Sequence, residues 1–136
     1  MRRWHTRLPE VVSAVQGLIA NAERALAAIQ AGDFAALGGC LSAYWAQKKV
    51  MAAGGEPSSV TKMMNALRKN GLVHGVSLGG GGGGGFLVAI TKEPHAKLEC
   101  KRAIEAAVES SVRAKLSFHG VEIDMDGVCI DGEPVF

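Results

Sequence analysis

Seven consecutive glycines, Gly79 to Gly85, lie between two short apolar segments at 75–78 and 86–90. Ordering glycine backbone is costly, at about 1–2 kcal/mol of conformational entropy per residue. A compact chain therefore keeps such a run only where bare backbone is needed. A phosphate, or a second strand that approaches too closely for any Cβ atom, would create that need.

The alternative for the glycine run is a flexible linker, which Gly-rich composition also fits. Linkers usually carry Ser, Pro or charge on their flanks, whereas the flanks here are strand-like. A domain boundary at this point would leave about fifty residues downstream, which is marginal for an independent core. The sequence therefore favours an ordered loop over a linker.

Composition indicates a single domain over 1–136, with 48% hydrophobic and only 5% aromatic residues. The net charge of +2 and the scattered basic residues predict no nucleic-acid partner. No apolar stretch approaches the roughly 20 residues that cross a bilayer. The first five residues resemble the charged start of a signal peptide, but Arg7, Pro9 and Glu10 follow them, so we expect a cytoplasmic protein without a membrane partner. The spacing of the cysteines fits neither a disulfide nor a metal site, which predicts free thiols at Cys40, Cys100 and Cys129.

Helical periodicity begins at residue 8 and continues to residue 29. Pro9 suits the first turn of this helix, and Gly32 suits its end. Its apolar residues are expected to share one face: Leu8, Val11, Val12, Val15, Leu18, Ile19, Ala22, Leu26 and Ile29.

Two further helices are predicted before the glycine run. Asp33 can cap the first of them, because its carboxylate can accept free N–H groups of the first turn, and residues 52–55 close it. Pro57 opens the second, which stops near 70–71. The expected apolar faces are Phe34, Leu37, Leu41, Tyr44 and Trp45, then Val60, Met63, Met64 and Leu67.

The apolar pattern then changes to that of strands. Strands are predicted over Leu72–Leu78 and Phe86–Thr91, followed by a helix that starts at 93–94, and by strands over Leu116–Ile123 and Val128–Ile130. The inward residues of that helix are expected to be Leu98, Ile104, Ala107 and Val108. The order α-α-α-β-β-α-β-β predicts an α+β fold, in which helices pack on one face of a four-stranded antiparallel sheet.

Consecutive glycine N–H groups can point into one concavity and bind anionic oxygens. No Gly-Lys-Ser/Thr follows the run, which excludes a Walker A loop, and Phe86 begins a strand rather than the helix of a dinucleotide site. Lys48 and Lys49 are candidates to neutralise phosphate, although cations also suit a solvated helix end.

Other candidate residues have competing structural interpretations. Tyr44 and Trp45 could stack on a ligand, but their helical spacing favours the core. Glu122, Asp124 and Asp126 alternate as strand carboxylates would around a metal, yet a tight turn at Asp126-Gly127 explains them more simply. We predict no metal site and no catalytic residue in this chain.

A resemblance to a known family becomes specific at the glycine run. The segment Leu78-Gly79-Gly80-Gly81-Gly82-Gly83-Gly84-Gly85-Phe86 resembles the third motif of the GHMP small-molecule kinases, from which it departs only at Gly79 and Gly81. The stretch Tyr44-Trp45-Ala46-Gln47-Lys48-Lys49-Val50-Met51, with Glu56-Pro57 after it and Gly32, Asp33 and Gly38 before it, resembles L-fucose kinases. Bacterial heptose-phosphate kinases share fewer of these features.

The resemblance implies that the chain is the carboxy-terminal, ferredoxin-like lobe of such a kinase. The nucleotide loop and catalytic Asp of the amino-terminal lobe do not occur in this sequence. That lobe would bind most of the ATP and Mg²⁺, and it is the implied partner, with a homodimer as the alternative. The cofactor-binding positions carried over are Gly80, Gly82, Gly83, Gly84 and Gly85.

The implied reaction is transfer of the ATP γ-phosphoryl group to the anomeric hydroxyl of L-fucose or a related sugar, with a heptose phosphate as the alternative acceptor. The chain alone would be inactive. Lys48 and Lys49 are the candidates for substrate contact because of their charge and not because of the resemblance. The alternative function is a free-standing α+β module that binds a phosphorylated ligand or docks on a protein.

Overall fold

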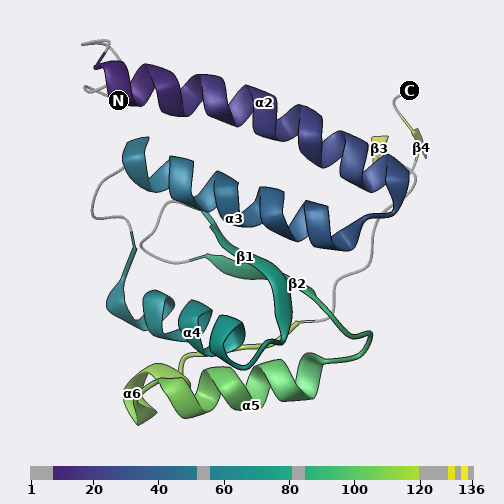
Figure 1. The fold of residues 1–136 in the computed structure, drawn as a ribbon. Helices are drawn as coiled ribbons and strands as arrows, with labels where there is room; N and C mark the ends of the chain where they lie inside the picture. Colours follow the sequence, from purple (N-terminus) through teal and green to yellow (C-terminus); the bar gives the residue numbers. More distant parts are fainter. Residues whose placement is uncertain (1–7, 52–55, 81–84, 120–128, 131–132, 135–136) are drawn as a thin grey trace.

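The computed structural model describes residues 8–51, 56–80, 85–119, 129–130 and 133–134. The elements stack in layers, with α2 on α3, α3 on a two-stranded hairpin, and α4 and α5 beyond that hairpin (Figure 1). In chain order they are α2 (Pro9–Ala31), α3 (Phe34–Met51), α4 (Ser58–Lys69), β1 (Val73–Gly79), β2 (Phe86–Thr91), α5 (Lys97–Ala107), α6 (Ser110–Arg113), β3 (Cys129–Ile130) and β4 (Glu133–Pro134).

The ends of the first helices follow the capping signals in the sequence. Gly32 ends α2 in the left-handed conformation, with φ of 66°, and its N–H bonds the carbonyls of Ala28 and Ile29. The Asp33 carboxylate accepts the N–H of Ala36 at 2.8 Å, so the predicted cap of α3 is confirmed. Two adjacent polar and glycine positions thus turn the chain from α2 back along α3.

The predicted four-stranded sheet is wrong for the described residues. β1 pairs with β2 in an antiparallel hairpin, and β3 pairs only with β4, in a separate sheet. Residues 116–119 form no strand, although Leu116 and Phe118 pack against the core. In this segment, alternating apolar residues therefore show that one side faces the core, but they do not show that the segment pairs with another strand. The rest of that predicted strand, 120–123, lies outside the described residues.

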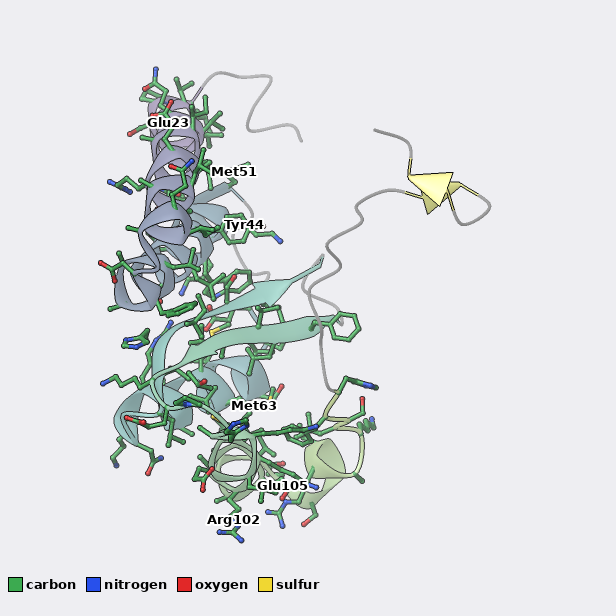
Figure 2. The ribbon with its side chains drawn as sticks, turned by 90° about the vertical axis from the view of Figure 1, so that its right-hand side faces the viewer. Glu23, Tyr44, Met51, Met63, Arg102 and Glu105 are labelled. Atoms are coloured by element: carbon green, nitrogen blue, oxygen red, sulfur yellow. The ribbon has the colours of Figure 1, made fainter. Side chains whose placement is uncertain are left out.

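The hydrophobic core lies between the hairpin and the pair α4–α5. Figure 2 shows Met63 of α4 pointing into this layer, and Met64 and Leu67 are 1% exposed there. All four residues predicted on the inward face of α4 are buried: Val60, Met63, Met64 and Leu67. Val76 and Leu78 of β1 supply the opposite wall.

The other face of β1 meets α3 through backbone. Register pairs Gly75 with Ile90 and Gly79 with Phe86, so the two glycines share a face of the hairpin. A Cβ atom on Gly75 would collide with the Gly38 carbonyl of α3. A Cβ atom on Gly38 would lie 2.7 Å from the His74 carbonyl carbon. Helix and strand therefore touch where neither has a side chain.

The second helix buries only part of its predicted face. Trp45 is 4% exposed, and Tyr44 and Leu41 are half-buried, whereas Phe34 is 64% exposed. Phe34 is the first residue of α3 and precedes the contact at Gly38, so it lies beyond the part of the helix that the hairpin covers.

The first helix buries a different stripe from the one expected. Ile19, Leu26 and Ile29 are 57% to 61% exposed, so the expectation that they share the buried face is wrong. Small side chains let α2 lie close to α3, and Asn21 donates to the Cys40 carbonyl at 2.8 Å in this interface. The buried residues of α2 are Val11, Ala14, Asn21 and Ala28.

The helix after the hairpin starts later than expected. The chain turns at His95, which has a φ of 65°, and α5 begins at Lys97 rather than at 93–94. Leu98 is 62% exposed, contrary to prediction, because it lies in the first turn. Ile104 is buried as predicted, and the short helix α6 was not predicted.

Replacing Gly38 by Ala should destabilise the protein by about 1–3 kcal/mol, because the added methyl overlaps strand backbone that cannot move aside. The neighbouring Gly39→Ala is the matched control. A Cβ atom on Gly39 meets nothing within 4 Å, so helix propensity should stabilise that variant by up to about 1 kcal/mol. Urea denaturation of both variants measures the difference. Equal midpoints for the two would show that the close approach does not hold in solution.

Candidate functional site

The glycine run connects two strands that pair with each other. Gly79 at the end of β1 pairs with Phe86 at the start of β2. The run is therefore a hairpin loop and not a linker between separately folded pieces. A Cβ atom on Gly85 would collide with the Gly79 carbonyl, and Gly85 has φ of 137°. The base of the loop thus needs residues without side chains, as the sequence suggested.

The candidate loop positions are only partly described. Gly80 is in the described part and has a positive φ of 99°, which favours glycine over any other residue. Gly82, Gly83 and Gly84 lie outside the described residues. The site is therefore built from the two ends of the loop and from the helix that contacts it.

Lys48 connects the last turn of α3 to the loop. Its Nζ donates to the Gly80 carbonyl at 2.8 Å, across 32 residues of sequence. The same ammonium lies 5.6 Å from the centroid of the Tyr44 ring and 5.8 Å from that of Trp45, within range of cation–π attraction. In Figure 2, Tyr44 lies on the side of α3 toward which the hairpin extends. The structure therefore places a positive charge at the entrance of the loop.

Lys49 has a different partner. Its Nζ lies 2.9 Å from Glu56 Oε2. The two neighbouring lysines, which the sequence could not distinguish, thus separate into one that contacts the glycine loop and one that forms an ion pair with the segment before α4.

Glu56 is the residue that sequence reasoning missed. Its carboxylate accepts the Trp45 indole N–H at 2.8 Å and the Thr61 hydroxyl at 2.7 Å, besides the contact with Lys49. Burial by itself raises the pKa of Glu56, but the hydrogen bonds from Thr61, Lys49 and Trp45 outweigh it and lower that pKa from its ordinary value of 4.5. The only sequence signal was the Glu56-Pro57 pair in front of a helix.

The hydrogen bonds to the Glu56 carboxylate help to fix the positions of Trp45 and of the two lysines at the end of α3. Trp45 is buried, and its indole N–H has a partner at Glu56, so the predicted core role of Trp45 is confirmed. Because the ring is fixed, the surface over which Lys48 lies is fixed as well. Glu56 thereby ties the end of α3 to the start of α4 beside the loop.

No group of His, Cys, Asp and Glu side chains that could hold a metal ion occurs in the part of the chain that the structure describes. The three acidic candidates at 122, 124 and 126 lie outside that part. Cys40 and Cys100 are free thiols as predicted, and burial, with a smaller effect of Glu99, raises the pKa of Cys100. None of the described helices is both long and apolar enough to cross a bilayer.

Comparison with known proteins identifies the family. Residues 25–110 match the model described as GHMP kinases C terminal. The chain therefore belongs to the GHMP kinase family and contains its carboxy-terminal domain. The matched region includes all of α3, the β1–β2 hairpin with its glycine loop, and α5. Comparisons with curated proteins and with solved structures gave no significant match.

Glu56→Gln should lower the free energy of unfolding at neutral pH by about 1–3 kcal/mol, because it removes the negative charge of a partly buried acceptor that serves three donors. The pKa of Glu56 is lowered in the folded state, so its contribution is complete above the unfolded value of 4.5 and is lost as pH falls through the folded value. The difference between wild type and variant should therefore shrink below pH 4.5, which urea denaturation at several pH values measures.

The control for this prediction is Glu109→Gln. Glu109 forms an exposed pair with Lys62 at 3.4 Å, and its side chain is 76% exposed, so the change should be close to zero at every pH. A difference between wild type and Glu56→Gln that stays constant down to acid pH would contradict the proposed role of the carboxylate.

Proposed function

We propose that this chain is the phosphate-facing part of an ATP-dependent sugar kinase, with L-fucose or a related sugar as acceptor. The γ-phosphoryl group of ATP, bound with Mg²⁺ mainly by an amino-terminal lobe, would pass to the anomeric hydroxyl of the sugar. Gly80, Gly82, Gly83, Gly84 and Gly85 would present N–H groups to phosphate oxygens. Membership of the GHMP kinase family and the contact between Lys48 and Gly80 support the proposal.

The hydrogen bond from Lys48 to the Gly80 carbonyl is the main observation behind this proposal. An ammonium group has three N–H donors, and the Gly80 carbonyl accepts one of them. A phosphate at the loop would meet backbone N–H groups and a cation that is already held beside them, so little ordering would be needed when the ligand binds. Phosphoryl transfer depends mostly on such positioning and on charge stabilisation.

The two lysines take different parts in this proposal. Lys48 would neutralise phosphate charge, whereas Lys49 would position the site through Glu56. The acceptor sugar rests on the resemblance of residues 44–57 to L-fucose kinases, and a heptose phosphate is the alternative. A cytoplasmic location, where ATP is abundant, fits this chemistry.

The proposed partner lobe has a surface to meet beside the loop. The hairpin face that carries Gly75 and Gly79 also carries Phe86 and Val88 on β2, which are 70% and 47% exposed. α3 lies over β1 and leaves these two side chains largely exposed next to the base of the loop, where the Phe86 ring has an edge contact with the ring of His119. A lobe that closes over the loop would cover them, and burying large apolar side chains would stabilise the closed arrangement.

Lys48→Met should weaken phosphate binding at the loop by about tenfold, because it removes a charged hydrogen-bond donor. The measurement is titration of the 136-residue chain with ATP and with inorganic phosphate, while NMR follows the amides of Gly80 and Gly85. Lys49→Met is the matched control and should bind with nearly wild-type affinity, since Lys49 is paired with Glu56. Loss of binding in both variants alike, or no loss in either, would contradict the assignment to Lys48.

The chain alone should show no L-fucose-dependent consumption of ATP, because the nucleotide loop and catalytic Asp of the family do not occur in it. Addition of the amino-terminal lobe of an L-fucose kinase as a separate polypeptide should restore measurable turnover, and Lys48→Met should reduce it. Turnover by the chain alone would contradict the proposal that an amino-terminal lobe supplies the nucleotide site. Phosphate binding without turnover in the combined sample would instead favour a free-standing binding module.

A further inference from the structure

A second apolar stripe runs along α2, beside the stripe that packs on α3. Its residues follow one another at spacings of three and four, as the a and d positions of a coiled coil do. Ile19, Leu26 and Ile29 on it are 57% to 61% exposed. The stripe consists of Val12, Val15, Ile19, Ala22, Leu26 and Ile29.

The composition of α2 makes this exposure unusual. Its large aliphatic residues Ile19, Leu26 and Ile29 face outward, while Ala14, Asn21 and Ala28, with Val11 near its start, take the buried positions. None of the three charged residues between 9 and 31, Glu10, Glu23 and Arg24, falls on the stripe. Contiguous apolar surface without charge of this kind marks an interaction site.

We propose that the stripe on α2 binds the same stripe of a second copy of this chain, with the two helices antiparallel. A two-fold axis between Ala20 and Asn21 would place Ile19 opposite the partner's Ala22. The same axis would place Val15 opposite the partner's Leu26, and Val12 opposite the partner's Ile29. Each layer then joins a larger side chain to a smaller one, so that all layers have similar volumes.

The pattern favours this orientation over a parallel one. Parallel pairing would put Ala22 against Ala22 between the larger layers of Ile19 and Leu26, which would leave one layer poorly filled. Antiparallel pairing also places the positive amino-terminal end of each helix beside the negative carboxy-terminal end of the other. Glu23 lies at the edge of the stripe, next to Ala22, and its nearest flanking neighbour would be the partner's uncharged Gln16.

The fold makes a short stripe sufficient for association. α2 is already held as a helix by α3, so dimerisation does not have to overcome the cost of helix formation. α2 is also the outermost layer, and the β1–β2 hairpin lies on the far side of α3 (Figure 1). A second copy on α2 is therefore compatible with the proposed phosphate site.

Analytical ultracentrifugation of the 136-residue chain over low to high micromolar concentrations tests the proposal. The chain mass of 14.2 kDa should rise to about 28 kDa, twice that value. Leu26→Lys should raise the dissociation constant by about tenfold or more, because it places a charge in each of the two layers that join Leu26 to Val15. Leu98→Lys, at a site on α5 that is 62% exposed, is the control and should leave it unchanged. Circular dichroism checks that both variants fold.

Cysteine cross-linking tests the orientation without a charged substitution. A mixture of Val15→Cys and Leu26→Cys chains should form a disulfide-linked heterodimer above the background of the wild-type cysteines, and Val15→Cys alone should not. Cross-linking of Val15→Cys with itself would show a parallel pair and overturn the two-fold arrangement.

Two results in the ultracentrifuge would overturn the proposal outright. A wild-type chain that remains monomeric at every concentration would leave the stripe for another occupant, such as the amino-terminal kinase lobe. A dimer that Leu98→Lys weakens as much as Leu26→Lys would place the contact elsewhere on the molecule.

Discussion

The side-chain-free contact between Gly38 of α3 and Gly75 of β1 fixes the rest of the structure. From this point the helix advances ten residues to Lys48, about 15 Å at 1.5 Å per residue. The strand advances five residues to Gly80, about 16 Å at its longer rise. The two paths are nearly equal in length, and Lys48 therefore reaches the Gly80 carbonyl at 2.8 Å. The contact between Gly38 and Gly75 fixes how α3 and β1 lie relative to each other, and this alignment brings the Lys48 ammonium to the glycine loop.

The contact at Glu56 stabilises the far end of the same helix. The carboxylate holds Trp45 and Lys49 of α3 together with Thr61 of α4, so the last turn of α3 is anchored to the layer beneath the hairpin. β1 is constrained from both sides, since Gly75 meets α3 while Val76 packs in the core. The base of the loop is thus positioned by backbone contact on one face and by apolar burial on the other, and Lys48 is positioned independently through its own helix.

Sequence patterns predicted where helices and strands lie along the chain better than they predicted which elements pack or pair with one another. The end of α2, the cap of α3 and the bounds of Phe86–Thr91 could be predicted because they depend on local chemistry, such as the carboxylate of Asp33. The sheet could not, because alternation along 116–119 shows which side chains face the core and not which strand pairs. On α2 the helical period produces two adjacent stripes, and only the close packing on α3 selects the one with small residues. The contact of Lys48 with Gly80 spans 32 residues and has no local signal beyond family resemblance.

The family match covers one part of the chain, and the rest lies outside it. The matched region, 25–110, includes Gly38, Lys48, Glu56 and both ends of the glycine loop, so the geometry of the candidate site lies within the family domain. Residues 9–24, most of α2, lie outside the match. Four residues of the outward stripe, Val12 to Ala22, lie in this part, whereas Leu26 and Ile29 lie within the match. The surface proposed for assembly and the loop proposed for phosphate chemistry are separated by one helix, so each can change in sequence while α3 keeps the other in place.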